Sequence, residues 1–142
     1  MLKVVFDTVV LVRSLINPHN SCGRIVFSHF AGYRLFISEP VAREMLEVLH
    51  RPELSRKFRQ LATMDLRQVI EILGQAEMVT VASVSPVSRD PKDDKFLATA
   101  AAAGADYLVS EDDDLLVLGE YQGVKIIRAE AFLRTLEGDV GD

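Results

Sequence analysis

PKDDKFLATAAAAGADYLVSEDDDLL, residues 91–116, contains a predicted helix and a predicted strand in immediate succession. Proline is favourable in the first turn of a helix, so Pro91 followed by an alanine-rich run predicts a helix that ends at Ala103, with Gly104 as its stop. Ala105–Ser110 is a short apolar run of the kind found in buried strands. Four acidic residues, 111–114, follow this strand directly.

The same alternation extends outward from this stretch in both directions. Further strands are expected at Leu2–Phe6, Arg34–Ser38, Met78–Ala82 and Val124–Arg128, and helices at about 21–31, 39–51, 52–62, 65–77 and 129–137. Strands that alternate with helices indicate a parallel sheet with helices on both faces. We therefore expect a single three-layer α/β domain over residues 1–137 with a five-stranded parallel sheet, and a short tail at 138–142.

Composition narrows the class of protein. The chain has 142 residues, which suits one domain, and its only cysteine, Cys22, excludes an internal disulfide framework and a cysteine-rich zinc site. It lacks both a signal-peptide core and a run of about 18 apolar residues that could span a membrane, so we expect a soluble cytoplasmic protein without a membrane partner.

Charge is unevenly distributed along the chain. The net charge is −5, which argues mildly against a nucleic-acid partner, but residues 51–67 carry +3 and residues 89–120 carry −6. The basic stretch is either a solvated helical face or, through Arg56 and Lys57, a contact for an RNA backbone. The acidic stretch is the stronger signal, because its carboxylates are concentrated near one strand end.

Acidic residues are expected to converge at the carboxyl edge of the sheet, where open parallel sheets bind ligands. The candidates follow strands or begin helices: Asp7, Glu44, Asp93, Asp94, Asp112 and Asp114. Taken singly, several could be helix caps or solvated residues. Taken together, they would repel one another unless a cation neutralised them, and oxygen ligands without histidine or cysteine suit Mg²⁺ or Mn²⁺. Such ions can activate water for phosphodiester cleavage. A phosphatase of the aspartyl-phosphate type is set aside, because it needs an acid where Val9 stands.

Three stretches, which contain four motifs, carry a resemblance to a known family. VVFDTVVLV at 4–12, SEPVAREMLEVL at 38–49 and the stretch 89–116 resemble, in order and spacing, the motifs of PIN-domain nucleases. Their toxin-like branch, which includes VapC-type partners of antitoxins, is the most similar in length and pattern. The resemblance implies a Mg²⁺- or Mn²⁺-dependent ribonuclease, often a homodimer and often held by a small antitoxin protein.

The resemblance also assigns roles to residues. It implies Asp7, Glu44, Asp94 and Asp112 as catalytic residues, Asp7, Asp94, Asp112 and Asp114 as metal ligands, and Thr8, Asp93 and Ser110 as supporting residues. Asp93 is the rival of Asp94 by one position. Val9 replaces an asparagine that is usual in the family, which removes a polar group near the site. The alternative hypothesis is therefore a weakened PIN fold that acts as an RNA- or protein-binding module.

Overall fold

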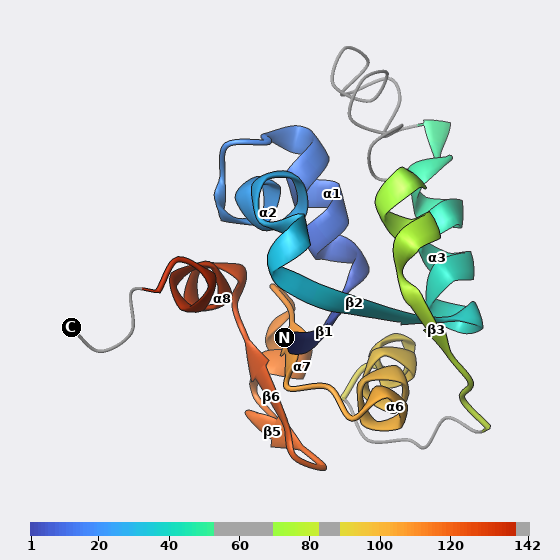
Figure 1. The fold of residues 1–142 in the computed structure, drawn as a ribbon. Helices are drawn as coiled ribbons and strands as arrows, with labels where there is room; N and C mark the ends of the chain where they lie inside the picture. Colours follow the sequence, from blue (N-terminus) through green and yellow to red (C-terminus); the bar gives the residue numbers. More distant parts are fainter. Residues whose placement is uncertain (53–69, 83–88, 139–142) are drawn as a thin grey trace.

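The computed structural model describes residues 1–52, 70–82 and 89–138 and forms an α/β fold around one sheet (Figure 1). The strands are β1 (Leu2–Phe6), β2 (Tyr33–Ser38), β3 (Glu77–Val79), β4 (Tyr107–Val109), β5 (Glu120–Tyr121) and β6 (Val124–Ile127). The main helices are α1 (Thr8–Ile16), α2 (Ser21–Gly23), α3 (Glu39–Leu49), α6 (Asp94–Ala103), α7 (Asp113–Leu116) and α8 (Ala129–Leu136).

The sheet has six strands in the order β3-β2-β1-β4-β6-β5. Every pairing is parallel except that of β5 with β6, which is antiparallel. The expected parallel sheet is thus confirmed, but the expected number of five strands is wrong. The missing strand, β5, is only two residues long and returns through Gln122 and Gly123, whose φ angles are 49° and 85°. Positive φ at both central residues is the geometry of a tight hairpin turn. A strand of two residues is too short to show a hydrophobic period, which is why the sequence pattern did not predict β5.

Two helical segments differ from the sequence-based expectation. α1 was not among the expected helices; Asp7 Oδ1 accepts the amide of Val10 at 3.0 Å and so starts it. The helix expected at 21–31 is broken into α2, a π-helical turn at Arg24–Ser28 and a 3₁₀ turn at Phe30–Gly32. Here Gly23 passes so close to Pro18 that a Cβ on Gly23 would lie 2.3 Å from the Pro18 carbonyl oxygen.

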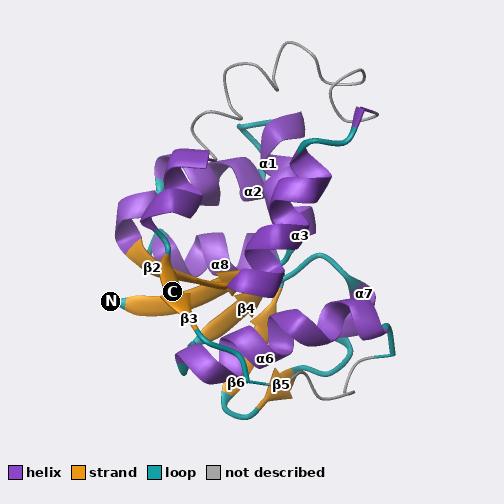
Figure 2. Ribbon diagram, turned by 90° about the vertical axis from the view of Figure 1, so that its right-hand side faces the viewer, coloured by secondary structure: helices purple, strands orange, loops and turns teal. Residues whose placement is uncertain are grey.

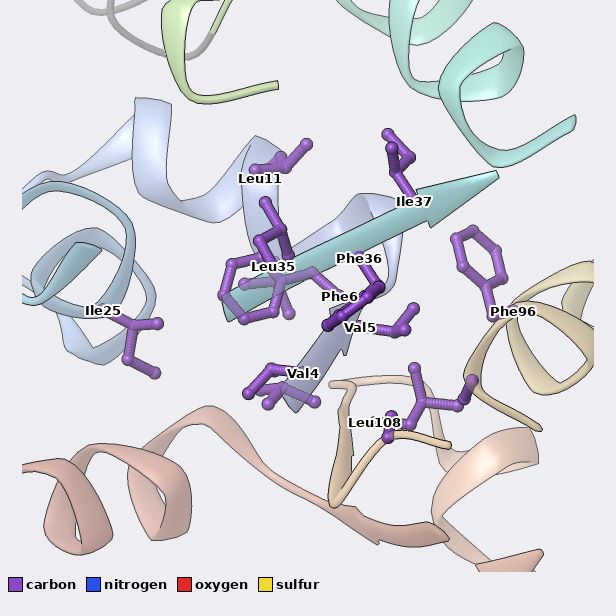
Figure 3. Packing of buried hydrophobic residues seen from close by; sticks show 14 of the residues in the cluster. Val4, Val5, Phe6, Leu11, Ile25, Leu35, Phe36, Ile37, Phe96 and Leu108 are labelled. Atoms are coloured by element: carbon purple, nitrogen blue, oxygen red, sulfur yellow. The ribbon is translucent and has the colours of Figure 1, made fainter. Parts of the chain in front are cut away.

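The hydrophobic core lies on both faces of the sheet. Helix α6 covers one face, and α1, α2 and α8 cover the other (Figure 2). Phe96 lies on the α6 side of the strands, whereas Leu11 and Ile25 lie on the opposite side (Figure 3). Tyr33 continues that second layer with edge-on contacts to the rings of Phe6 and Phe132. Because both faces are covered, β1 is held rigidly in the middle of the sheet, and the residue that follows it has a fixed position.

Several expectations concern residues outside the described ranges. Most of the helices expected at 52–62 and 65–77, together with Arg56 and Lys57, fall there, although residues 70–75 are helical. The tail expected at 138–142 also falls there, apart from Gly138. Among the described residues, no helix is both long enough and apolar enough to cross a membrane.

Candidate active site

Asp7 is the innermost acid of the site. It follows β1 directly, and its backbone N–H donates to the carbonyl of Val109 on β4 at 3.1 Å, which places it where two central strands end. Its Oδ1 accepts the amide of Val10, and its Oδ2 accepts hydrogen bonds from the Ser110 hydroxyl and, at 3.3 Å, from the amide of Glu111. These bonds favour the charged form, yet burial to 3% exposure outweighs them and raises the pKa of Asp7 to about 6.

Asp93 and Asp112 form a hydrogen-bonded pair of acids near Asp7. Asp93 ends a 3₁₀ turn, Pro91–Asp93, and is 7% exposed. Burial, followed by hydrogen bonding to Asp112 and the negative charge of Asp112, raises the pKa of Asp93 to about 7; the charge of Asp7 adds to this rise. Asp93 Oδ2 is buried without a hydrogen-bond partner. A buried carboxylate oxygen in this state is costly, and a bound cation would satisfy it.

Two further acids extend the cluster toward solvent. Carboxylate oxygens of Asp90, Asp93 and Asp114 all lie within 4.8 Å of one another, which is close enough for one ion to contact all three. Arg89 faces this group, with its Nη2 2.9 Å from Oδ1 of Asp114. Asp90 was not a candidate from the sequence, although its position three residues before Asp93 is the spacing that brings side chains together in helical turns.

Glu44 lies beside the cluster in a different kind of environment. It is in the second turn of α3, and its Oε1 pairs with Nζ of Lys95 at 2.6 Å. Its Oε2 accepts a hydrogen bond from the hydroxyl of Thr8. Lys95 is a second residue that the sequence motifs did not single out.

A cavity of about 700 Å³ opens over these residues. Its lining comes from α1 (Thr8, Val9, Val12), from α3 and the residues after it (Pro40, Arg43, Glu44, Glu47, Val48, Arg51), from the turns that carry the acids (Asp90, Lys92, Asp93, Asp112) and from Lys95 in α6. The cavity therefore combines an acidic floor with cationic and apolar walls. Such a volume is typical of small-ligand sites.

Asp94 is the predicted site residue that the fold places elsewhere. It is 4% exposed and lines a separate cavity of about 220 Å³ with Leu97 and Tyr121. The large cavity is lined by Asp93 and not by Asp94. The structure brings Asp93 together with Asp7 and Asp112.

A divalent cation fits the donor set on the evidence of the side chains themselves. Asp7, Asp93 and Asp112 supply only carboxylate oxygens, which are ligands that Mg²⁺ and Mn²⁺ prefer. Two of these acids hold raised pKa values, and Asp93 has one oxygen without a partner. A bound cation would remove both penalties at once.

Comparisons with known proteins bear on the family and the fold of this chain. A family model described as PIN domain matches residues 3–114. The crystal structure of PAE2754 from Pyrobaculum aerophilum superimposes with a TM-score of 0.62 at 16% identity, covering 96% of this chain and 90% of that chain. VapBC2 from Rickettsia felis, solved with a DNA fragment from the promoter of its own genes, gives a TM-score of 0.56 at 13% identity, covering 88% of this chain and 97% of that chain. At such identities the likeness shows a shared fold. No protein of curated function matches the chain.

Proposed function

The chain belongs to the PIN domain family, and on this premise we propose that it is a Mg²⁺- or Mn²⁺-dependent endoribonuclease, the toxin of a toxin–antitoxin pair. The observation that carries the proposal is the buried, unpartnered oxygen of Asp93 next to Asp112 and Asp7. PIN domains are generally nucleases that use divalent metals, and this arrangement of acids is suited to such an ion.

Asp7, Asp93 and Asp112 would hold the cation, with Asp114 and Asp90 at the outer side of the cluster. When bound, the ion supplies activation of a water molecule and charge stabilisation at the phosphodiester. Asp93 takes the position that the motif comparison gave to Asp94, because Asp93 is the residue that faces Asp112.

Other residues of the site orient its acids or carry positive charges that would attract a polyanionic substrate. Ser110 orients Asp7 by donating to its Oδ2. Arg43, Arg51 and Lys92 line the cavity and would attract RNA phosphates, which offsets the repulsion expected from a net charge of −5. Arg56 and Lys57 remain further candidates for RNA contact.

Partners follow from the same proposal. The similar fold of VapBC2, which was solved as a complex bound to promoter DNA, supports a small antitoxin protein as the partner of this chain. We also propose a homodimer that acts in the cytoplasm, where its RNA substrate is found.

The test is cleavage of single-stranded RNA by the purified protein with millimolar Mn²⁺, compared with the same reaction in chelator. The expected result is endonucleolytic cleavage that chelator abolishes and that Asp93→Asn reduces by at least 100-fold. Val9, which is 37% exposed on the cavity wall, favours the second candidate function, a binding module. RNA binding without Mn²⁺-dependent cleavage would support that alternative and overturn the nuclease proposal.

A further inference from the structure

Glu44 differs from Asp93 because both of its carboxylate oxygens already have side-chain partners. Oε1 lies 2.6 Å from Nζ of Lys95, and Oε2 accepts the hydroxyl of Thr8. Asp93, in contrast, keeps a buried oxygen without a partner. A metal at Glu44 would compete with the ammonium group of Lys95 for the same carboxylate, whereas ligation by Asp93 would satisfy an oxygen without a partner.

Lys95 is held in a defined place by this arrangement. Its side chain and that of Glu44 are each 22% exposed, so the pair is partly shielded from water. An ion pair beside the same cavity is far more exposed to solvent: the side chains of Arg43 and its partner Glu39 are 75% and 76% exposed. A partly buried, hydrogen-bonded pair restrains its members more than an exposed pair does.

Lys95 lines the same cavity as the acids of the site. It follows Asp93 by two residues in the first turn of α6, and both residues line the large cavity together with Asp112. An ammonium group has three N–H donors. Only one is needed for Glu44, so the others can reach a phosphate oxygen that approaches the acids.

We propose that Lys95 is a catalytic residue that contacts the scissile phosphate, and that Glu44, oriented by Thr8, is its positioning residue and not a metal ligand. This inference rests on the proposed nuclease function. Lys95 would then supply part of the charge stabilisation at the phosphate. A fixed ammonium group placed where negative charge develops in the transition state lowers the activation barrier.

Metal binding in the absence of RNA tests the part of the proposal that concerns Glu44. Calorimetric titration with Mn²⁺ should give Glu44→Gln and Lys95→Met affinities within about threefold of the wild type. The directions should be opposite: Glu44→Gln lowers the affinity by leaving Lys95 unneutralised, and Lys95→Met raises it by removing a positive charge. Asp93→Asn is the comparison, and its Mn²⁺ affinity should fall by at least tenfold. An equal loss for Glu44→Gln and Asp93→Asn would make Glu44 a metal ligand and overturn the proposal.

Cleavage kinetics test the part that concerns Lys95. Removal of one preorganised donor of this kind typically costs about 10²–10³ in kcat, so Lys95→Met should lower kcat by that factor, with a smaller rise in KM from the lost ground-state contact. Lys95→Arg keeps the charge and should recover part of the loss, and Glu44→Gln should cost about 10–100-fold, the usual effect of an orienting partner. Lys125→Met, on the exposed face of β6, is the matched control and should behave as the wild type. A kcat for Lys95→Met within threefold of the wild type would overturn the proposal.

A metal-free measurement separates this inference from the nuclease proposal. A fluorescent single-stranded 2′-O-methyl oligoribonucleotide, which resists cleavage, is titrated in chelator against each variant whose thermal midpoint shows that it is folded. Lys95→Met should bind more weakly, with a salt dependence that is flatter by about 0.7 in slope, and Lys125→Met should not. If the wild type cleaves no RNA, the nuclease proposal fails while this binding result and the Mn²⁺ titration still decide the roles of Lys95 and Glu44. Unchanged oligonucleotide binding by Lys95→Met would exclude a phosphate contact.

Discussion

Ser110 donates its hydroxyl hydrogen to Oδ2 of Asp7, although 103 positions separate the two residues in the sequence. The same hydroxyl oxygen accepts the amide of Asp112 at 2.9 Å. One fully buried side chain thus connects the acid at the end of β1 with the acid that begins α7. The relative position of Asp7 and Asp112 depends on it.

Ser110→Ala should therefore weaken both the fold and the metal site. Loss of the hydroxyl removes one hydrogen bond from the buried Asp7 and leaves the amide of Asp112 without its acceptor, which should lower the free energy of unfolding by about 1–3 kcal/mol. It should also raise the pKa of Asp7 further, because the hydroxyl now stabilises its charged form. Chemical denaturation and Mn²⁺ titration check these effects. Ser110→Thr keeps the hydroxyl and serves as the comparison; an Ala variant that matches the wild type in both measurements would contradict the linking role.

The choice between Asp93 and Asp94 is decided by a pair of matched variants. Asp93→Asn should remove Mn²⁺ binding and should stabilise the metal-free protein at pH 8, where the wild-type Asp93 is charged, but not at pH 5, where it is protonated. Asp94→Asn should keep Mn²⁺ affinity within about threefold and lose about 0.3–1 kcal/mol of stability, because it removes a negative charge from the start of α6. Thermal melts and titrations measure both. The opposite pattern would restore Asp94 as the third acid of the site.

The raised pKa values of Asp7 and Asp93 predict how stability depends on pH. Folded-state values of about 6 and 7 exceed the ordinary 3.8, so the folded chain binds these protons more tightly than the unfolded chain does. The contribution of these two protonated acids to the free energy of unfolding is fully present below about pH 4 and is lost as pH rises through 6 and 7. For Asp7 alone the loss is on the order of 3 kcal/mol.

Denaturation in chelator between pH 5 and pH 8 should therefore show stability that falls with rising pH. Mn²⁺ at one hundred times its dissociation constant should add about 2.7 kcal/mol, and its affinity should rise with pH because both acids must lose their protons first. A metal-free protein that is equally stable at pH 5 and pH 8, and that Mn²⁺ does not stabilise, would show that these acids are structural.

Val9→Asn tests the residue that departs from the family pattern. Val9 is partly exposed in the first turn of α1 and lines the cavity two residues after Asp7. The asparagine amide adds a donor near the acids at little cost in packing, so cleavage should rise severalfold while the midpoint of unfolding stays nearly constant. Steady-state kinetics beside a thermal melt provide the check. Lower activity at unchanged stability would mean that the apolar side chain itself serves the substrate.

The hydrophobic pattern predicted the central part of the fold well. Leu2–Phe6 matches β1 residue for residue, and the helix stop at Gly104 is confirmed by its φ of 62°. These features are local, because they depend on apolar runs and on glycine's tolerance of positive φ. α1 escaped prediction because its start depends on the capping carboxylate of Asp7 as well as on propensity. The two-residue strand β5 depends on its partner β6, which no local pattern encodes.

The candidate site was likewise predictable where it depends on local sequence and not where it depends on distant residues. Its general location followed from the rule that acids after parallel strands share one edge. The choice between Asp93 and Asp94 depends on how the 3₁₀ turn enters α6, and a one-residue change in that turn redirects each side chain. The environment of Glu44 depends on Lys95, 51 residues away, and could not be inferred from either motif alone.

The long sequence separation between Asp7 and Ser110 also has a consequence for biosynthesis. Asp7 leaves the ribosome before Ser110, which follows β4 and is 103 residues further along the chain. Until then β1 lacks one of its two neighbouring strands. A chain that has not yet reached Ser110 therefore cannot bring Asp7 and Asp112 together. We expect the proposed nuclease activity to be absent until synthesis has passed this point.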